Sequence, residues 1–475
     1  MNSGPSRGQI LDEITSSALS TEFDDLDQAV VENTRRRVFD MIGCAVGGSA
    51  LEDVRAVVSA LGPATNDRGA TALGLGRTLP VHDAAMVNCI AGRSFDWGPL
   101  TLVIDDSRTP SHISETSVLT GVAVGEHLGV SGEDLLTAIV VGDDIAARAW
   151  LAAGDRPMPG GESGIVAGFE QWGTVTTLAA AIIAGRLFGL TQHELKNAMA
   201  LAVGMMTGAG HALWDGATSF KLSQGSASRN GILAAQLAQA GWTGIDEPLF
   251  GERGYYSVFE TGCDAPEWLY EDLGNTFYVE NCFKPYPGGR PTDAPIEAAI
   301  RLSREHDIDF EDVDEFVVRP KALARHYTKP YEVGEYPPGH ALFSFKYAAA
   351  SALVHGKAGN AQYTPEGVRN AQVQKLIQKT TLEPIDRDLE SWGCEVEVRS
   401  RSTSSIEAFV EVPNGDPSNP MSKAELTKKF ENQARFAGTI EEAHLSRFID
   451  RIDQLVDVED VGTITRLAKG EYQPL

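Results

Sequence analysis

The sequence has 475 residues and a formal net charge of −26, and 42% of its residues are hydrophobic. A chain of this length exceeds one ordinary hydrophobic core, so two or three domains are expected. The acidic surplus argues against a nucleic-acid partner and against an anionic membrane surface, but it leaves room for a small anionic substrate in a local basic pocket.

The first part of the chain shows helical hydrophobic periodicity. Apolar residues recur at helical spacing from Ala29 to Gly47, and Ser131 and Thr191 are suitable N-terminal caps for two further helices. The longest apolar run, Thr174 to Leu190, is rich in alanine and too short to span a bilayer, so we expect a buried helix there. Residues 1–272 are therefore predicted to form the N-terminal part of a helical domain.

Beyond residue 272 the pattern changes. Short segments with strand character are separated by helical ones. The strand candidates are Phe277–Val279, Phe316–Arg319, Cys394–Arg399 and Ile406–Val412. These patterns predict an α+β unit at residues 273–416 and a return to helix at residues 417–475. The predicted fold class is mainly α with an α+β second domain.

Several features are missing from the sequence. The five cysteines form no CxxC pair, which argues against a disulfide framework and fits a reducing, cytoplasmic compartment. The N-terminal stretch lacks the basic and apolar regions of a secretory signal. There is no GxGxxG after a strand, no GxxxxGKS or GxxxxGKT, no HExxH and no GxSxG. We therefore expect no metal, no nucleotide cofactor and no hydrolase triad.

One loop between two helical segments carries the most reactive side chains. Asp96 opens it, His112 closes it, and Asp106 lies between them. A histidine suits proton transfer near neutral pH, and a nearby carboxylate can orient it. These residues are therefore candidates for a base that acts on a carbon acid and for its partner. The alternative is a helix-capping aspartate and a surface histidine.

Further candidate residues stand on later segments. Lys221 precedes a helical run, where its ammonium group and free backbone N–H groups would bind a carboxylate; the alternative is an exposed lysine. Lys284 and Arg290 lie in a loop rich in proline and glycine, and Arg290 would clamp a carboxylate with two hydrogen bonds. The alternative for this loop is a solvated hinge. Tyr347, on an apolar helix, is a candidate proton donor or a core tyrosine with a satisfied hydroxyl.

Short motifs occur in a specific order along nearly the whole chain. They are Arg36–Gly43 (RRVFDMIG), Ala91–Asp96 (AGRSFD), Ser111–His112, Trp172–Thr174 (WGT), Lys221–Gly231 (KLSQGSASRNG), Lys284–Pro287 (KPYP) and Phe343–Tyr347 (FSFKY). Together they resemble the MmgE/PrpD family, which includes 2-methylcitrate dehydratase, cis-aconitate decarboxylase and iminodisuccinate epimerase. The resemblance implies a large helical domain with a smaller α+β lid, a homodimer, a site between the domains and no cofactor.

The resemblance also implies roles for particular residues. By position, Asp96, His112, Lys221 and Tyr347 match residues that line the site in the decarboxylase branch. The chain departs from the family elsewhere. Trp97 and an apparent insertion follow Asp96, where many members have an Asp-Asp pair. The loop before Gly173 has no histidine, a serine follows Lys221-Leu222 where a histidine is common, and Gly289, Arg290 and Asp293 stand where His or Cys often occur.

The leading hypothesis is a cofactor-independent lyase, of dehydratase or decarboxylase type, that acts on a small carboxylate. His112, oriented by Asp96 or Asp106, would move the proton, Lys221 would hold carboxylate, and Tyr347 would protonate the leaving group or the product carbon. The predicted substrate-binding residues are Arg93, Trp97, Asp106, Trp172, Lys284 and Arg290. The alternatives are an isomerase or epimerase with the same proton abstraction, and a non-catalytic carboxylate-binding protein.

Overall fold

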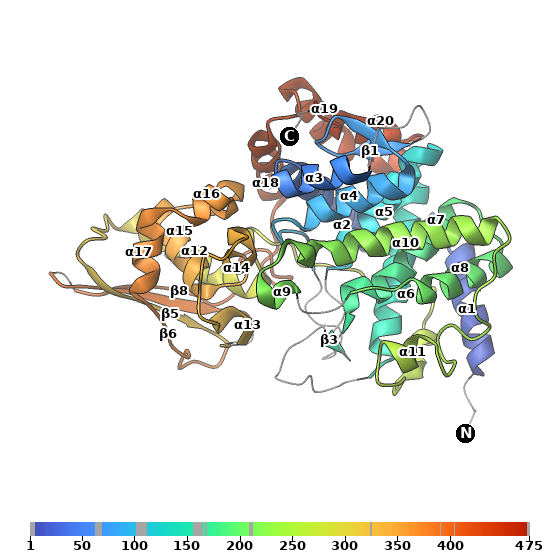
Figure 1. Cartoon of the computed structure of the whole chain (residues 1–475), viewed down its shortest axis with the longest axis horizontal. Helices are drawn as coiled ribbons and strands as arrows, with labels where there is room; N and C mark the ends of the chain where they lie inside the picture. Colours follow the sequence, from blue (N-terminus) through green and yellow to red (C-terminus); the bar gives the residue numbers. More distant parts are fainter. Residues whose placement is uncertain are drawn as a thin grey trace.

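The computed structural model describes residues 5–61, 69–100, 112–154, 165–166, 169–208, 212–323, 325–389, 391–402 and 404–472. A large helical domain lies beside a smaller domain that combines a sheet with helices (Figure 1). The chain builds most of the large domain first, then the smaller domain, and its last helices return to the large domain. The fold class is therefore the predicted one, mainly α with an α+β second domain.

The large domain is built from helices of 10 to 21 residues. They are α1 (Arg7–Ser20), α2 (Gln28–Gly48), α3 (Glu52–Leu61), α4 (Val81–Arg93), α5 (Ser114–Leu128), α6 (Gly132–Leu151), α7 (Val175–Leu187), α8 (Gln192–Gly204) and α10 (Leu222–Gln239). Shorter elements lie between them: helices α9 (Ala212–Asp215) and α11 (Tyr255–Val258), and the hairpins β1 (Ala70–Ala72) with β2 (Arg77–Leu79) and β3 (Ile165–Val166) with β4 (Phe169–Glu170).

Helix α7 is central to this domain, because α5, α6, α8 and α10 all pack against it. Every residue from Val175 to Gly185 is buried, which confirms the predicted buried helix. Small residues allow this packing: a side chain at Gly231 of α10 would collide with α7 at Ala180 and Ala181. Within the described ranges, no helix combines the length and hydropathy needed to cross a membrane.

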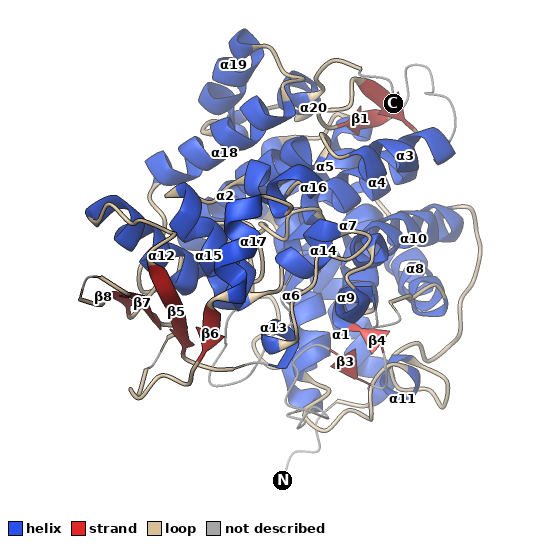
Figure 2. Cartoon of the chain, turned by 60° about the vertical axis from the view of Figure 1, so that its left-hand side comes forward, coloured by secondary structure: helices blue, strands red, loops and turns tan. Residues whose placement is uncertain are grey.

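The second domain is a four-stranded sheet in the order β6-β5-β7-β8, with helices on one face (Figure 2). Its strands are β5 (Val313–Pro320), β6 (Thr380–Leu382), β7 (Cys394–Ser400) and β8 (Ile406–Val410), and its helices are α12 (Asp293–Glu305), α13 (Arg325–Thr328), α14 (Pro337–Ala341), α15 (Phe345–His355), α16 (Pro365–Val368) and α17 (Ala371–Gln378). Strands β7 and β8 pair antiparallel, with Cys394 opposite Val410, as their alternating sequences predict.

The predicted strand at Phe277–Val279 is wrong, because the chain there has no strand partner. The Tyr278 N–H donates instead to the Asp144 carboxylate at 3.0 Å. The Tyr278 ring packs edge-on against Trp268 and lies under the guanidinium of Arg148. The side chains of Asp144, Arg148 and Trp268 thus hold Tyr278 against the helical domain, and no sheet is involved.

The C-terminal helices α18 (Lys423–Ala437), α19 (Glu442–Ile452) and α20 (Gly462–Thr465) pack against the large domain. The rings of Phe39, Phe430 and Phe448 form a stack between α2, α18 and α19. Beside this stack the buried Lys429 ammonium forms an ion pair of 2.7 Å with Asp40 and donates to the Trp97 carbonyl at 2.7 Å. The end of the chain therefore holds the backbone next to Asp96.

Replacing Lys429 with alanine is expected to destabilise the protein by about 3–5 kcal/mol, because it leaves the Asp40 carboxylate buried and unpaired. Urea unfolding of the wild type and the variant measures the change. Lys428, the exposed neighbour on the same helix, provides the control, and its alanine variant is expected to match the wild type. Equal stability of all three proteins would show that the Lys429–Asp40 pair contributes nothing.

Candidate active site

Two site residues adopt left-handed backbone conformations that side chains rarely take. Asp96, just after the end of α4, has φ 46°, and His112, just before α5, has φ 63°. Such conformations cost free energy and persist only where the surroundings enforce them, which is common at functional sites. Residues 101–111 of the loop between them, which include the predicted substrate-binding residue Asp106, lie outside the described residues.

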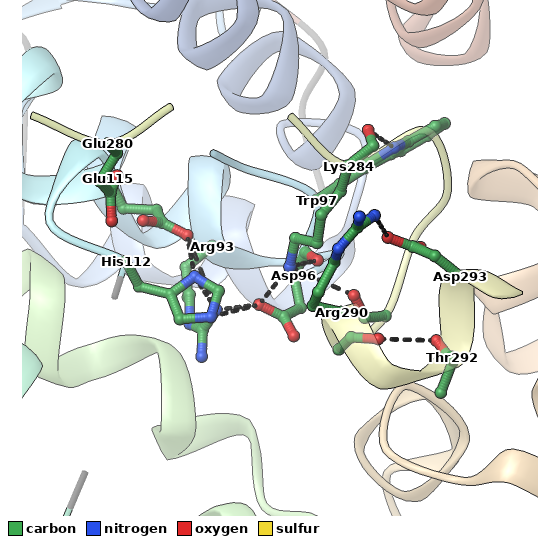
Figure 3. Close-up of polar contacts among 12 residues, drawn as sticks. Arg93, Asp96, Trp97, His112, Glu115, Glu280, Lys284, Arg290, Thr292 and Asp293 are labelled. Carbon is green, nitrogen blue, oxygen red and sulfur yellow. Dashed lines mark hydrogen bonds and ion pairs between the residues drawn. The ribbon is translucent and has the colours of Figure 1, made fainter. Parts of the chain in front are cut away.

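The Asp96 carboxylate binds two buried cations (Figure 3). Arg93, one turn earlier, forms an ion pair with Oδ1, and Lys284 Nζ lies 3.0 Å from the same oxygen. Lys284 also donates to the backbone carbonyl of Asp96 and to that of Gly288, the latter at 3.2 Å. Burial opposes ionisation, but the charges of Arg93, Lys284 and His112 outweigh it and hold the pKa of Asp96 well below its usual range.

The His112 imidazole lies between two carboxylates and a guanidinium. Its Nδ1 is 3.0 Å from Glu115 Oε1 and 3.0 Å from Arg93 Nη1, and its Nε2 is 3.6 Å from Asp96 Oδ1. Burial, together with the Arg93 charge, lowers the pKa of His112 although both carboxylates oppose the shift. The neutral ring is thus favoured near pH 7, and a neutral imidazole accepts a proton.

Asp96, His112 and Glu115 resemble a metal-binding set, since their ligand atoms lie within 4.8 Å of one another. Arg93 Nη1, however, approaches all three: it bonds Asp96 and lies 3.0 Å from His112 Nδ1 and 3.6 Å from Glu115 Oε1. The guanidinium therefore already supplies a positive charge among these three groups, where a metal ion would otherwise supply it.

Glu280 fixes the start of helix α5 next to His112. Its two carboxylate oxygens accept the backbone N–H groups of Ile113 and Ser114 at 2.9 and 3.0 Å. These are among the N–H groups that a helix cannot satisfy by itself. Burial, and then the charge of Glu115, raise the pKa of Glu280 to about 8. Glu280 is therefore a buried cap that orients the segment carrying His112.

Trp172, a predicted substrate-binding residue, packs against this cluster. Its ring meets His112 edge-on at 6.1 Å, and the Arg93 guanidinium carbon lies 5.8 Å from its centre. Its Nε1 donates to Glu170 Oε2 at 2.6 Å. Glu170 thus joins the site through Trp172, and it stands in the loop where the family resemblance would place a histidine.

Lys221, a predicted catalytic residue, has partners of its own. Its ammonium group pairs with Asp53 of α3 and lies 3.0 Å from the Tyr336 hydroxyl of the second domain. Burial lowers the pKa of Lys221, and Asp53 opposes the shift. Lys221 and Arg93 both lie within 6 Å of the Phe220 ring centre, at 5.9 and 5.8 Å. The structure thus places Lys221 beside the Asp96 cluster rather than in contact with that carboxylate.

Arg290 and Trp97, two predicted substrate-binding residues, instead bond groups of the chain itself. Arg290 forms ion pairs with Asp293 at 2.7 Å and Asp416 at 3.4 Å. Its guanidinium group therefore already binds two carboxylates of the chain. The Trp97 Nε1 donates to the Lys284 carbonyl at 2.9 Å. These contacts tie together the loops that meet at the site, which is a structural role for both side chains.

Tyr347, the predicted proton donor, lies in the second domain. Its hydroxyl donates to the Gln362 carbonyl, and its ring stacks on Tyr331 at 5.7 Å and meets Tyr363 edge-on at 5.4 Å. Burial raises its pKa far above its usual value. The side chain is therefore bonded within its own domain, which corresponds to the core alternative considered above.

The second domain contributes groups that the sequence did not reveal. His326 and Tyr327 of α13 are close enough for the Asp96 charge to affect both pKa values. Burial, and then Lys329, lower the pKa of His326 to about 3. Burial, and then Asp96, raise the pKa of Tyr327. Residues 325–328 mix polar and aromatic types without periodicity, so only the three-dimensional arrangement assigns this segment to the site.

The fold, a large helical domain beside a smaller α+β domain, corresponds to two domains that one protein family combines in a single chain. The MmgE/PrpD N-terminal domain matches residues 12–267, and the MmgE/PrpD C-terminal domain matches residues 286–454. The chain belongs to the MmgE/PrpD family.

Three relatives illustrate this similarity. The human protein named cis-aconitate decarboxylase is 26% identical over 94% of this chain and 92% of its own length. The mouse protein of the same name is 25% identical over 94% and 90% of the two chains. A third cis-aconitate decarboxylase, from Aspergillus terreus, is 24% identical over 94% of each chain.

The raised pKa of Glu280 predicts a pH-dependent stability. The folded state holds this proton up to about pH 8, whereas the unfolded value is 4.5, so the folded state binds more protons in between and stability falls as pH rises through this window. A glutamine at position 280 does not titrate. The free energy of unfolding of the wild type, minus that of Glu280→Gln, should fall from pH 5 to pH 8 when both are measured by urea unfolding. A constant difference would contradict the assigned shift.

Proposed function

We propose that this protein is a lyase that acts on a small carboxylate-bearing molecule and moves a proton at a carbon next to a carboxylate. The observation that carries this proposal is the buried His112 imidazole beside two cations, Arg93 and Lys284, where the two domains meet. The names of the human, mouse and Aspergillus relatives support decarboxylation of an unsaturated polycarboxylic acid as one candidate reaction.

Arg93 offers a place for a substrate carboxylate. Its Nε is buried and has no hydrogen-bond partner among the described residues. An unsatisfied buried donor costs about 1–3 kcal/mol, which a substrate oxygen would recover on binding. Lys284 pairs with the same Asp96 oxygen as Arg93 and adds a second positive charge. Together these cations would stabilise the negative charge that develops when a proton leaves the neighbouring carbon.

His112 is the proton acceptor in this proposal. Glu115 at Nδ1 orients the ring, and burial keeps the ring neutral, so Nε2 is suited to take a proton from carbon. Asp96 stabilises the imidazolium that results, because Oδ1 is 3.6 Å from Nε2. Tyr347 is left out of the mechanism, since its hydroxyl is bonded to Gln362.

Substitution of His112 with glutamine is expected to reduce kcat/KM by about a hundredfold or more, because the variant lacks the proton acceptor. The reaction is followed by NMR in D2O with di- and tricarboxylic acids, cis-aconitate among them, and with aromatic hydroxy acids. This assay separates loss of CO2, loss of water and simple exchange of a carbon-bound proton. Exchange without either loss would favour an isomerase or epimerase.

The exposed His193 gives the matched control, and His193→Gln should keep wild-type turnover. Wild-type turnover by His112→Gln would contradict the assignment of the base. A wild-type protein that binds these acids in a thermal-shift assay but changes none of them would instead favour a non-catalytic binding protein.

The lowered pKa of His112 predicts how kcat/KM depends on pH. The base works only when unprotonated, and its pKa in the folded protein lies below the ordinary 6.5. Activity should therefore be retained at pH 6.5 and decline only at lower pH. A pH profile of kcat/KM measures this limb, and a midpoint above 6.5 would contradict the role of a buried neutral histidine.

A further inference from the structure

Glu170, at the end of β4, is a buried carboxylate that the proposed mechanism does not yet use. Its residue is 1% exposed. The Trp172 Nε1 and the Ser223 hydroxyl both donate to its Oε2, at 2.6 and 3.0 Å. Its own backbone N–H donates to the Gly208 carbonyl at 2.7 Å. Glu170 is therefore held by its neighbour Trp172 and by two separate segments of the large domain, at Gly208 and Ser223.

The Trp172 indole connects Glu170 to His112. The indole Nε1 donates to Glu170. The Trp172 ring meets the His112 imidazole edge-on, with 6.1 Å between the ring centres and an interplanar angle of 89°. The neighbouring backbone is also constrained, because a side chain at Gly173 would collide with the Thr207 carbonyl. Glu170 and His112 thus contact the same aromatic side chain at fixed positions.

We propose that Glu170 is a second acid–base residue of this site, the proton donor that works with His112 as the acceptor. The inference rests on the proposed function and takes the place that the sequence assigned to Tyr347. Both hydrogen bonds to the carboxyl group enter at Oε2, so the transferable proton is carried by Oε1.

The environment of Glu170 favours a proton donor, and the environment of His112 favours a proton acceptor. Burial raises the pKa of Glu170, and the Trp172 and Ser223 hydrogen bonds and the Arg93 charge offset the shift only in part. Burial and Arg93 lower the pKa of His112. Glu170 and His112 both contact Trp172, and their pKa values are shifted in the opposite directions expected of an acid and a base.

In an elimination, His112 Nε2 takes the proton from the carbon next to the carboxylate. The C–H electron pair forms the C=C bond, the C–O bond to the leaving hydroxyl breaks, and this oxygen takes the Glu170 proton and leaves as water. In a decarboxylation, the C–C bond to the departing carboxylate breaks, its electron pair stays on the substrate, and the carbon receives the Glu170 proton. After elimination, solvent removes the proton from His112 and returns one to Glu170; after decarboxylation, only Glu170 has to regain its proton.

The test compares Glu170→Gln, Ser223→Ala and the exposed-residue control Glu252→Gln in the NMR assay, with a pH profile of kcat for each. Glutamine keeps an acceptor oxygen for the Trp172 N–H but carries no transferable proton. We expect Glu170→Gln to lower kcat by about a hundredfold at unchanged thermal stability. With a substrate that loses water, it should still exchange the carbon-bound proton with D2O, because His112 is intact.

The Ser223→Ala variant tests whether Glu170 is the proton donor, because it predicts the direction in which the pH profile of kcat moves. Ser223→Ala removes a donor that stabilises the Glu170 carboxylate, so the pKa rises further and the alkaline limb of the kcat profile should move to higher pH. In Glu170→Gln this limb should disappear. Glu252→Gln should match the wild type in both rate and profile.

The possible outcomes separate the two proposals. Wild-type turnover by Glu170→Gln, or an alkaline limb that Ser223→Ala leaves unmoved, would overturn the role of Glu170 while the lyase proposal stands. Equal loss of exchange and product in Glu170→Gln would also overturn it, because Glu170 would then only position Trp172. A wild-type protein that neither exchanges nor converts any of the acids would overturn the lyase proposal and this one together.

Discussion

The Asp96 carboxylate is the group on which the site depends. It forms ion pairs with Arg93 and Lys284, two cations that are almost completely buried, and it fixes where each points. Buried charges are tolerated only when they are paired, so the three side chains form one unit. The backbone of this segment is held as well: Lys284 binds the Asp96 carbonyl and Lys429 binds the Trp97 carbonyl. The left-handed conformation of Asp96 is thus maintained by lysines from two distant parts of the chain.

Much of the fold follows from local sequence. The alanine-rich run around α7 and the Thr191–Glu194 capping box of α8 are readable because the determining residues are neighbours in the sequence. The alternation in β7 and β8 is equally local. The parallel pairing of β5 with β6 could not be read in this way, because it joins residues more than 60 positions apart. The strand predicted around Tyr278 is wrong for a related reason, since its partner Asp144 is also distant in sequence.

Site residues could be predicted from the sequence where the residue type alone indicates acid–base or carboxylate-binding chemistry. Arg93, Asp96, His112, Trp172 and Lys284 do come together. For Lys221 and Arg290 the sequence indicates a cation but not its distant partners, because Asp53 and Asp416 are more than 120 residues away. Only Asp293, the nearer partner of Arg290, is a neighbour in the sequence. The sequence does not single out Glu115, Glu170 and Glu280, since a glutamate in a helix or loop normally faces solvent. A weak signal existed for Glu170, which stands in the loop that lacks the histidine common in the family.

The charge balance of the cluster determines how it can bind an acid. Arg93 and Lys284 carry two positive charges, and Asp96 and Glu115 carry two negative ones, so no net charge attracts an anion. Binding must instead use individual donors that the chain leaves unsatisfied, such as Arg93 Nε. In a buried site such a donor acts over a few ångströms with little screening, whereas the −26 charge of the whole chain is spread over a solvated surface. A strongly acidic protein can therefore bind a carboxylate, provided that the substrate displaces water and meets these donors directly.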